Sequence, residues 1–520
     1  MRAAGVNGGS PRGTLFAELV STSKAVGATR SRSAKIALLS DTLRRLAPGE
    51  REVAVSVLAG EPRQGRIGIG WATLSALAPP PAAEPSLTIG EVDAVLSELD
   101  DLAGTGSVAA RQGVLASLLS RCTADEADYL RRLLVGEVRQ GALAGVVTDA
   151  VARAAGVPAD AVRRAVMLSG DVGHVAAVAL ADGVEGLAGV RLEVLRPVLP
   201  MLASTAPDVT TAIAELGLCS VEWKLDGARV QAHRKGADVR LFTRNLNDVT
   251  DRLPGVVEIV ASLPVDAVVL DGEVVGLDAD DRPDRFQDTM SRFGRHDGSG
   301  RSLTAAWFDV LHLDGEDLLD LPLGTRLEAL GRVAAPWRVR HVVTDDPAAA
   351  AVVLAESLAT GHEGVMVKAI GSPYEAGRRG AAWRKVKPVT TLDLVVLAAE
   401  WGHGRRRGWL SNLHLGARDP RGGFVMVGKT FKGLTDELLT WQTARLSELA
   451  VHSSGHVVEV RPELVVEIAL DGVQASSRYE GGVALRFARV RRYREDKDAG
   501  DADTIDTVRA MLARGGPDPA

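Results

Sequence analysis

The sequence predicts a multidomain protein with an all-α domain first, an α+β domain second and a small β-barrel domain last. Its 520 residues are enough for about three domains. Apolar residues recur with helical spacing over roughly the first 190 residues, and short β-branched runs predominate in the remainder. The expected boundaries are a tail at 1–14, the helical domain at 15–195, the α+β domain at 201–388 and the barrel domain at 389–510.

The helical domain carries both start and stop signals. One helix is predicted from the spacing of Val108, Gln112, Leu115, Leu118 and Leu119. Thr123 and Glu126 form a capping box at the start of the next helix, and its apolar stripe comprises Leu130, Leu133, Leu134 and Val138. A further helix is expected to end at Gly156, with Pro158 soon after. Residues 196–200, Arg-Pro-Val-Leu-Pro, are expected to form a linker between domains.

The other two domains are rich in predicted strands. The second alternates strands with helices, one of which is expected at residues 348–360. In the third domain, strands are expected at residues 392–397, 424–427, 457–460 and 465–468. One helix, at residues 438–449, interrupts them. About five strands with a single helix indicate a small Greek-key barrel of the OB kind.

Composition argues against several classes of protein. The two cysteines, Cys122 and Cys219, are far apart, which argues against a zinc ribbon and against a disulfide framework. No apolar run approaches the roughly 20 residues of a membrane span. The first 14 residues lack the apolar core of a signal peptide. We therefore expect a cytoplasmic protein in a reduced compartment, without a membrane.

The most informative segment is Lys-Leu-Asp-Gly-Ala-Arg at residues 224–229. A lysine is ordinarily a poor nucleophile because its pKa is about 10.4, but cationic neighbours or a metal can keep it neutral long enough to attack. The glycine permits close approach of the backbone, and Arg229 stands where it can bind a nucleotide. This order suits a covalent nucleotidyl site at Lys224. Alone, the six residues are equally compatible with an ordinary surface turn.

Further motifs follow in order and at domain-like distances. The first three are Thr243-Arg244-Asn245 after an apolar run, a strand at 268–275 with Asp271 and Glu273 around a glycine, and an apolar strand at 307–311. The next two are a strand with Glu363 and Lys368 at its ends and a segment at 383–388 in which Lys385 and Lys387 share one face. The last is a basic segment from Arg486 to Lys497. Six ordered motifs are far more specific than any one of them.

With these motifs, the chain resembles ATP-dependent DNA ligases of the compact bacterial and archaeal type. The resemblance runs from the first helices to residues 494–497 and so covers nearly the whole chain. It implies a helical DNA-binding domain, an ATP-grasp-like adenylation (nucleotidyltransferase) domain and an OB-fold domain. The implied reaction seals nicks in duplex DNA with ATP and Mg²⁺ or Mn²⁺, through a lysyl-AMP and an adenylated 5′-phosphate, in replication, repair or recombination.

The resemblance also implies a role for each candidate residue. Lys224 attacks the α-phosphate of ATP. The metal-facing carboxylates are Glu273 and Glu363, because Mg²⁺ prefers one or two carboxylates together with phosphate and water. In ATP binding, the resemblance implies Glu222 at the adenine amino group and Phe308 stacked on the base. It implies Arg229 and Arg244 at the ribose and phosphates, and Glu273 at the ribose. Lys385, Lys368 and Lys387 are implied at the phosphate oxygens, and Arg379 is included for its spacing before Lys385.

The last motif departs from the family pattern at one position. Ala488 stands where the family's Arg-Phe-Pro-Arg has its proline. The resemblance implies that this segment moves in to orient the pyrophosphate. Self-adenylylation is therefore expected to depend on its retained residues, which are Arg486, Arg494, Asp496 and Lys497.

The formal net charge of −6 does not exclude a nucleic-acid partner, because phosphate contacts depend on local patches. Basic patches are expected between Lys24 and Lys35, at residues 405–407 and at 486–494. With nicked duplex DNA as the implied partner, the residues expected to bind its phosphates are Arg30, Arg32 and Lys35. A sliding clamp or repair proteins are further candidate partners, and a monomer is expected.

Four alternatives remain open at this point. An mRNA capping enzyme shares the Lys-x-Asp-Gly motif and an OB domain, but neither it nor an RNA ligase needs the long helical domain. An NAD-dependent ligase is expected to carry a four-cysteine zinc module, which two cysteines cannot make. A non-catalytic DNA-binding scaffold is the fourth. Retention of Lys224, Glu273, Glu363 and Lys385 argues against it.

Overall fold

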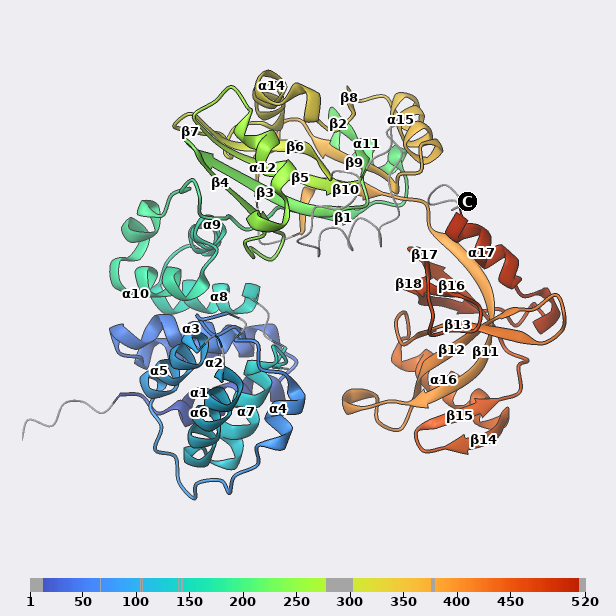
Figure 1. Ribbon diagram of the computed structural model, residues 1–520, viewed down its shortest axis with the longest axis horizontal. Helices are drawn as coiled ribbons and strands as arrows, with labels where there is room; N and C mark the ends of the chain where they lie inside the picture. Colours follow the sequence, from blue (N-terminus) through green and yellow to red (C-terminus); the bar gives the residue numbers. More distant parts are fainter. Residues whose placement is uncertain are drawn as a thin grey trace, which may run out of the picture.

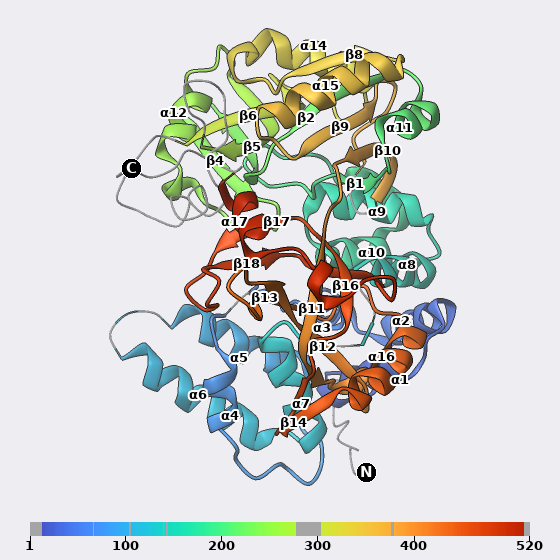
Figure 2. The same ribbon diagram turned by 90° about the vertical axis from the view of Figure 1, so that its right-hand side faces the viewer.

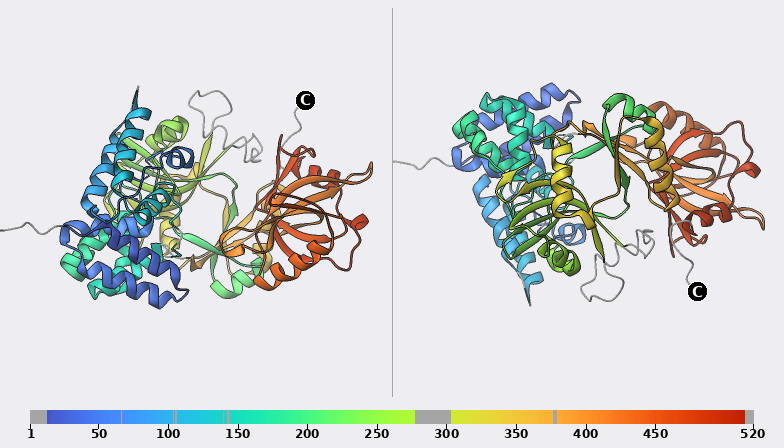
Figure 3. Two further views of the ribbon diagram at one scale, coloured as in Figure 1. Left: turned by 90° about the horizontal axis from the view of Figure 1, so that it is seen from below. Right: turned by 90° about the horizontal axis from the view of Figure 1, so that it is seen from above.

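The computed structural model describes residues 13–513 except 66, 103, 105, 139, 142–143, 277–302 and 376–378, and except the side chains of 379–381 and 513. Three parts follow one another along the chain and form an open C in the view of Figure 1. A helical part and a strand-rich C-terminal part lie at the two ends, and a central part with two sheets joins them. Views from below and above keep the two ends on opposite sides (Figure 3).

The helical part comprises α1 (Phe16–Ala28), α2 (Arg32–Arg45), η1 (Pro48–Glu50), α3 (Arg51–Ala59), α4 (Trp71–Ala76), α5 (Ile89–Asp101), α6 (Ser107–Arg121), α7 (Ala124–Leu134), α8 (Ala144–Ala155), α9 (Ala159–Ser169) and α10 (Val172–Gly189). The predicted capping box of Thr123 and Glu126 is confirmed at the start of α7. Gly156 ends α8 with a φ of 69°, as expected for a helix C-terminus. The predicted stripe of α6 is confirmed at Leu115, Leu118 and Leu119, which are buried, but not at Val108 and Gln112, which are exposed.

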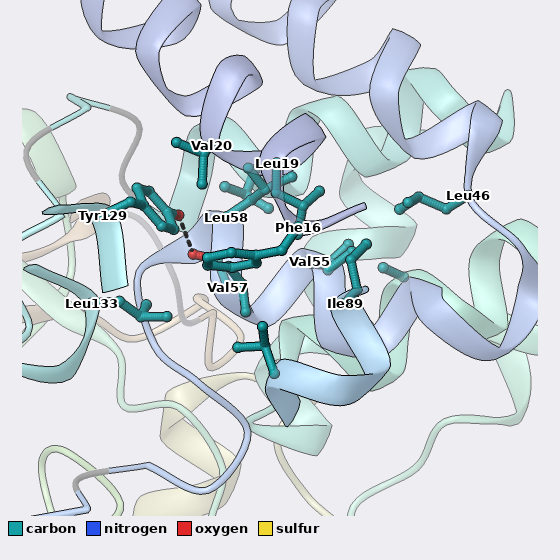
Figure 4. Close-up of a cluster of buried hydrophobic side chains, with 14 of the residues drawn as sticks. Phe16, Leu19, Val20, Leu46, Val55, Val57, Leu58, Ile89, Tyr129 and Leu133 are labelled. Atoms are coloured by element: carbon teal, nitrogen blue, oxygen red, sulfur yellow. Dashed lines mark hydrogen bonds between the residues drawn. The ribbon is translucent and has the colours of Figure 1, made fainter. Parts of the chain in front are cut away.

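One apolar core holds these helices together. Phe16 and Leu19 of α1 pack against Val57 and Leu58 of α3 and against Tyr129 of α7 (Figure 4). The hydroxyl of Tyr129 donates to the carbonyl of Val57 at 2.9 Å, so the buried polar atom is satisfied. The helical prediction for this region is therefore confirmed.

The central domain contains two five-stranded sheets. The first has the order β1 (Leu202–Thr205), β10 (Arg379–Val386), β9 (Gly364–Ala369), β2 (Cys219–Lys224) and β8 (His341–Thr344). The second has the order β4 (Asp238–Thr243), β3 (Ala228–Lys235), β5 (Ala267–Val275), β6 (Thr304–Leu313) and β7 (Glu316–Asp317). Strand β1 runs parallel to β10, and the other pairs are antiparallel.

Each sheet is covered by helices on one face. Helices α11 (Val209–Leu216) and α15 (Pro347–Ala359) pack on the first sheet, and α12 (Pro254–Ala261) and α14 (Leu323–Val333) pack on the second. The short turns η2 (Thr250–Arg252) and η3 (Ala335–Trp337) adjoin the second sheet. A third cluster joins residues of both sheets, including Met201, Leu311 and Trp383. The inner faces of the two sheets therefore pack against each other. In each strand, the side chains between the sheets alternate with those that face the helices.

The C-terminal domain is built around the long strand β11 (Thr390–Trp401), which pairs with β12 on one edge and with β15 and β16 on the other. Its remaining elements are η4 (Gly404–Arg406), β12 (Leu410–Arg418), β13 (Phe424–Thr430), α16 (Asp436–Glu448), β14 (Ala450–Ser454), β15 (Val457–Val460), β16 (Val465–Leu470), β17 (Gly472–Ala475), β18 (Val483–Arg486), β19 (Arg489–Tyr493), η5 (Ala499–Asp501) and α17 (Ile505–Ala513). The four predicted strands and the predicted helix are confirmed. The prediction missed β12, β14 and β17 to β19, and the described strands do not close into a barrel.

Among the described residues, α10 is the one helix that is long and apolar enough to cross a membrane by length and composition. The sequence predicts no such segment. In the structure, α10 is broken at Gly183, whose backbone is not helical, and it packs on α3, α8 and α9. Its apolar residues Val175, Ala176 and Ala179 belong to the core of the helical domain.

A buried ion pair fastens α14 to the second sheet. Arg326 of α14 and Asp309 of β6 are both 0% exposed, and two guanidinium nitrogens donate to the carboxylate at 2.7 and 3.1 Å. A third nitrogen donates to the carbonyls of Leu321 and Ser372. All three guanidinium nitrogens of Arg326 thus donate hydrogen bonds, which meets the condition for burying a charge.

We predict that Arg326→Met destabilises the central domain by about 3–5 kcal/mol, because Asp309 is left buried without its counterion. Hydrogen exchange of the α14 and β6 amides measures the loss within this domain. The double variant Arg326→Met/Asp309→Asn removes the stranded charge and is expected to regain protection. Equal protection in wild type and the single variant would contradict the prediction.

Candidate active site

The candidate site forms where the inner faces of the two central sheets meet. On β2, Val221 and Trp223 pack in the core of the outer face, so alternation turns Glu222 and Lys224 toward the other sheet. The same alternation on β3 and β5 turns three more charged residues inward: Arg229, Asp271 and Glu273. The inward face of each sheet therefore carries charge, and the outward face carries the apolar core.

Two glycines permit this close arrangement. A Cβ at Gly227 would lie 2.2 Å from the carbonyl oxygen of Val274, so the loop after Lys224 passes β5 at backbone contact. A Cβ at Gly272 would lie 2.4 Å from the ring of Trp307. The expectation that the glycine after Asp226 allows close backbone approach is confirmed.

The amine of Lys224 pairs with Glu363, which directly precedes β9. Glu363 also accepts from Nζ of Lys387 at 3.1 Å, and its backbone N–H donates to the Lys224 carbonyl. Burial by itself raises the pKa of a carboxyl, but Lys224 and Lys387 outweigh burial and lower the pKa of Glu363. Two amines and a carboxylate thus gather at the end of β2.

A second ion pair lies deeper between the sheets. Glu222 accepts from Nζ of Lys368 at 2.6 Å and from the Ser220 hydroxyl at 3.0 Å, and both charged side chains are about 1% exposed. Burial raises the pKa of Glu222, while Lys368 opposes the shift. Lys368 also donates to the Phe308 carbonyl at 3.3 Å. The pair is fixed in place rather than free to reorient.

Aromatic rings line the same region. Phe308 meets Trp383 edge to face, with ring centroids 6.1 Å apart. The ammonium of Lys368 lies 4.3 Å from the Phe308 centroid and 4.2 Å from that of Trp383, and Arg229 lies 5.3 Å from Phe308. Phe308 is half-buried and contributes to two core clusters.

Glu273 and Glu363 are the carboxylates that fit a divalent cation. Burial raises the pKa of Glu273 to about 7, and Asp271 adds to the effect while Lys224 and Arg229 oppose it. A cation beside Glu273 would favour its charged form. No group of three or more His, Cys, Asp or Glu side chains in the described part of the chain can hold a metal by itself. The donor set therefore fits an ion held jointly with phosphate and water.

The C-terminal domain reaches the site through Arg486, at the end of β18, which donates to Asp226 at 3.2 Å. The β17–β18 hairpin lies on the side of the C-terminal domain that faces the central domain (Figure 1 and Figure 2). Asp471 adds a second contact, 3.6 Å from Nζ of Lys387. Arg494 and Lys497 instead pair with Asp393 inside their own domain. Of the last motif, this structure brings Arg486 to the site.

Three other predicted residues occupy different surroundings. Lys385 lies on β10 two residues after Trp383, so alternation places it on the same strand face as that ring, which belongs to the cluster between the sheets. Arg244 is exposed in the turn after β4. Arg379 begins β10, opposite Leu202 of β1, and its side chain lies outside the described residues.

The predicted DNA-contacting residues differ among themselves. Arg30 is exposed in the loop between α1 and α2. Arg32 is exposed at the start of α2 and pairs with Asp149 at 2.6 Å. Lys35 is buried, and its ammonium donates to the carbonyls of Gln140 at 2.8 Å and Gly141 at 3.0 Å. That geometry is a structural contact between α2 and the loop before α8, and it corrects the expectation that Lys35 is available to phosphate.

Three residues that the structure places at the site have no role in the prediction from the sequence. Asp271 binds Arg229 through both carboxylate oxygens, at 3.0 and 2.6 Å. Its signal was present, because it stands two residues before Glu273 on one strand face. Trp383 had a weaker signal, two residues before Lys385. Tyr374, which donates to Asp271 at 2.7 Å, lies in none of the motifs.

Models of three ligase families match the chain. The DNA ligase N terminus matches residues 74–152, the ATP dependent DNA ligase domain matches 200–387, and the ATP dependent DNA ligase C terminal region matches 406–497. These segments correspond to the three parts of the fold.

Similar proteins and structures agree. A probable DNA ligase of Saccharopolyspora erythraea is 57% identical over 498 residues, covering 96% of this chain and 98% of its own. A probable DNA ligase of Rhodococcus jostii is 55% identical over 500 residues, covering 96% and 99%. A solved structure called Pmar-Lig_PreS3 covers 92% of this chain and 99% of its own, with a TM-score of 0.61 and 17% identity, which shows a shared fold. From these likenesses and its ordered motifs, the chain belongs to the ATP-dependent DNA ligases.

Proposed function

We propose that Lys224 is the residue that carries AMP. Ligases of this family act through a lysyl-AMP intermediate. The neutral amine attacks the α-phosphorus of ATP and gives up a proton. An N–P bond forms, the P–O bond to the β-phosphate breaks, and pyrophosphate leaves with the electron pair. A 5′-phosphate oxygen at the nick then attacks the AMP phosphorus, and the N–P bond breaks to free the Lys224 amine. The 3′-hydroxyl finally attacks the phosphorus of the 5′-phosphate and loses its proton, and AMP leaves. The observation that carries this assignment is the Lys224–Glu363–Lys387 cluster at the meeting of the two sheets.

The other charged residues divide by position. Glu222 and Phe308, deep between the sheets, suit the adenine, and the Lys368–Glu222 ion pair favours a role for Lys368 in orienting Glu222. Arg229 suits the ribose and α-phosphate. Near the Lys224 amine, the cations suited to the phosphate oxygens are Lys385 and Lys387, with Arg244 and Arg379 as further candidates.

Glu273 and Glu363 are proposed to hold the divalent cation. When bound, the cation would neutralise charge on the phosphate oxygens, and Glu363 would be both its ligand and the partner of the Lys224 amine. Mg²⁺ and Mn²⁺ both suit two carboxylates with phosphate and water.

The C-terminal domain is proposed to be an OB fold, and the domain boundaries to be 15–195, 201–388 and 389–510 after a tail at 1–14. Two contacts support an incomplete barrel: the N–H of Val490 donates to the Lys432 carbonyl at 2.9 Å, and Thr430 donates to the Ala488 carbonyl at 2.5 Å. They bring β19 beside the end of β13. Adenylation chemistry and nick binding are then separate tasks of separate domains.

The helical domain is proposed to grip nicked duplex DNA, with Arg30 and Arg32 as candidate phosphate contacts. We further propose a monomer that works in the cytoplasm. A sliding clamp or repair proteins stay candidate partners. Membership in the ATP-dependent DNA ligases favours this reading over a capping enzyme, an RNA ligase, an NAD-dependent ligase or a non-catalytic scaffold.

We predict that Lys224→Ala abolishes transfer of label from α-labelled ATP to the protein, because we assign the attack on the α-phosphorus to its amine and assign Lys385 and Lys387 to the phosphate oxygens. The variant is expected to seal a nick that already carries 5′-adenylate, at a reduced rate. Lys235→Ala, at the exposed end of β3, is the matched control. A covalent protein–AMP adduct in Lys224→Ala would refute the assignment.

Glu273→Gln and Glu363→Gln are each expected to slow nucleotidyl transfer by roughly 10²–10³, the loss typical of one charge-stabilising group. Both variants should need more Mg²⁺ for half-maximal transfer. Glu356→Gln, exposed on α15, controls for the substitution itself. Metal titrations that match wild type would assign both carboxylates a structural role.

Removal of residues 1–190 is expected to leave Lys224 self-adenylylation largely intact while nick binding collapses. The cut retains the linker and the whole central domain. Binding by the full chain should weaken steeply with salt, with a log–log slope of about −0.9 for each phosphate neutralised. If the truncated chain binds nicked duplex as tightly and with the same slope, the helical domain serves another purpose.

A further inference from the structure

Tyr374 is a buried tyrosine whose hydroxyl has three neighbours. It is 1% exposed and lies after β9. The hydroxyl donates to Asp271 at 2.7 Å, accepts from the backbone N–H of Met201 at 3.0 Å and lies 3.4 Å from a guanidinium nitrogen of Arg229. Burial and Asp271 raise the pKa of Tyr374, so the hydroxyl keeps its proton as a donor.

Arg229 is held by the same group of atoms. Two of its nitrogens donate to Asp271, and a third donates to the Met201 carbonyl at 2.7 Å. The carbonyl and N–H of Met201 are therefore both used, one by Arg229 and the other by Tyr374. A planar guanidinium fixed at three nitrogens has a defined direction for its remaining N–H groups.

The linker that ends at Met201 is bound to the same strand as Arg229. Gln231 accepts from the N–H of Val198 at 2.8 Å and donates to its carbonyl at 3.2 Å. His233 accepts from the N–H of Leu195 at 3.1 Å, so its other ring nitrogen donates to Gln231. Burial and His312 lower the pKa of His233 to about 3, which keeps the ring neutral.

The opposite side of the linker is bound to the helical domain. The N–H of Leu199 donates to the Met167 carbonyl at 2.9 Å, and Arg196 donates to the Ser169 carbonyl at 3.1 Å. Hydrogen bonds thus connect the end of α9 to the linker and the linker to β3. Arg229, on β3, is the last residue in this series.

We propose that Tyr374 is a positioning residue for Arg229, acting with the main chain of Met201, so that the interdomain linker is a structural part of the nucleotide site. This inference rests on the proposed function, because Arg229 must bind the nucleotide for its orientation to matter. Tyr374 itself does not touch the nucleotide. Its hydroxyl fixes Asp271 and Met201, and these two fix Arg229.

The test is Tyr374→Phe in the full chain, assayed by self-adenylylation at varied ATP. The KM for ATP is expected to rise roughly three- to tenfold, the loss typical of one buried hydrogen bond, while kcat stays within about twofold. Tyr129→Phe is the matched control, because it removes a buried, hydrogen-bonded hydroxyl from the helical core (Figure 4). That control should lower the thermal midpoint and leave the KM unchanged.

A double-mutant cycle with Arg229→Lys separates positioning from general stability. If Tyr374 acts through Arg229, the double variant has a KM close to that of Arg229→Lys alone. If the rise in KM of the double variant equals the product of the two single rises, or if Tyr374→Phe leaves the KM unchanged, the inference is overturned. Should Tyr374→Phe not fold, Asp271→Asn takes its place with the same expectations. Absence of a protein–AMP adduct in wild type would instead refute the proposed function.

Discussion

Burial of charge between the two central sheets is the constraint on which the site depends. Moving a carboxylate or an ammonium out of water costs several kcal/mol unless a partner meets it with good geometry. The site meets this condition with three pairs that cross from strand to strand: Lys224 with Glu363, Lys368 with Glu222, and Arg229 with Asp271. Each pair fixes the distance between two strands. The same side chains that can bind a nucleotide therefore also hold neighbouring strands of each sheet together.

Much of this architecture could be predicted, because strand alternation and helix caps are local signals. Lys224 and Glu222 follow from one motif, and Thr123 with Glu126 follows from another. Two of the missed strands of the C-terminal domain lacked such signals. Strand β14 is exposed at every position, so it shows no apolar alternation. Strand β19 carries arginines at Arg489, Arg491 and Arg492, and its charge hid its pairing with β16.

The remaining errors arise from contacts between residues far apart in the chain. Lys35 belongs to a basic patch in sequence, but folding buries it against the carbonyls of Gln140 and Gly141. Tyr374 is separated from Asp271 by about a hundred residues and stands in no motif, so only the fold brings them together. A single sequence gives the chemistry of a residue and its strand face, but it does not give the partner across the sheet.

The hydrogen-bonded linker couples the helical domain to the central domain. Alternate side chains of β3 hold one side of the linker and the end of α9 holds the other, so opening either domain breaks contacts of both. These bonds therefore stabilise both domains against local opening. The C-terminal domain joins the chain through residues 387–390 and contacts the site through Arg486 and Asp471. The described hydrogen bonds thus link the helical domain to the central domain on both sides of the linker, whereas the family models divide the chain between 152 and 200.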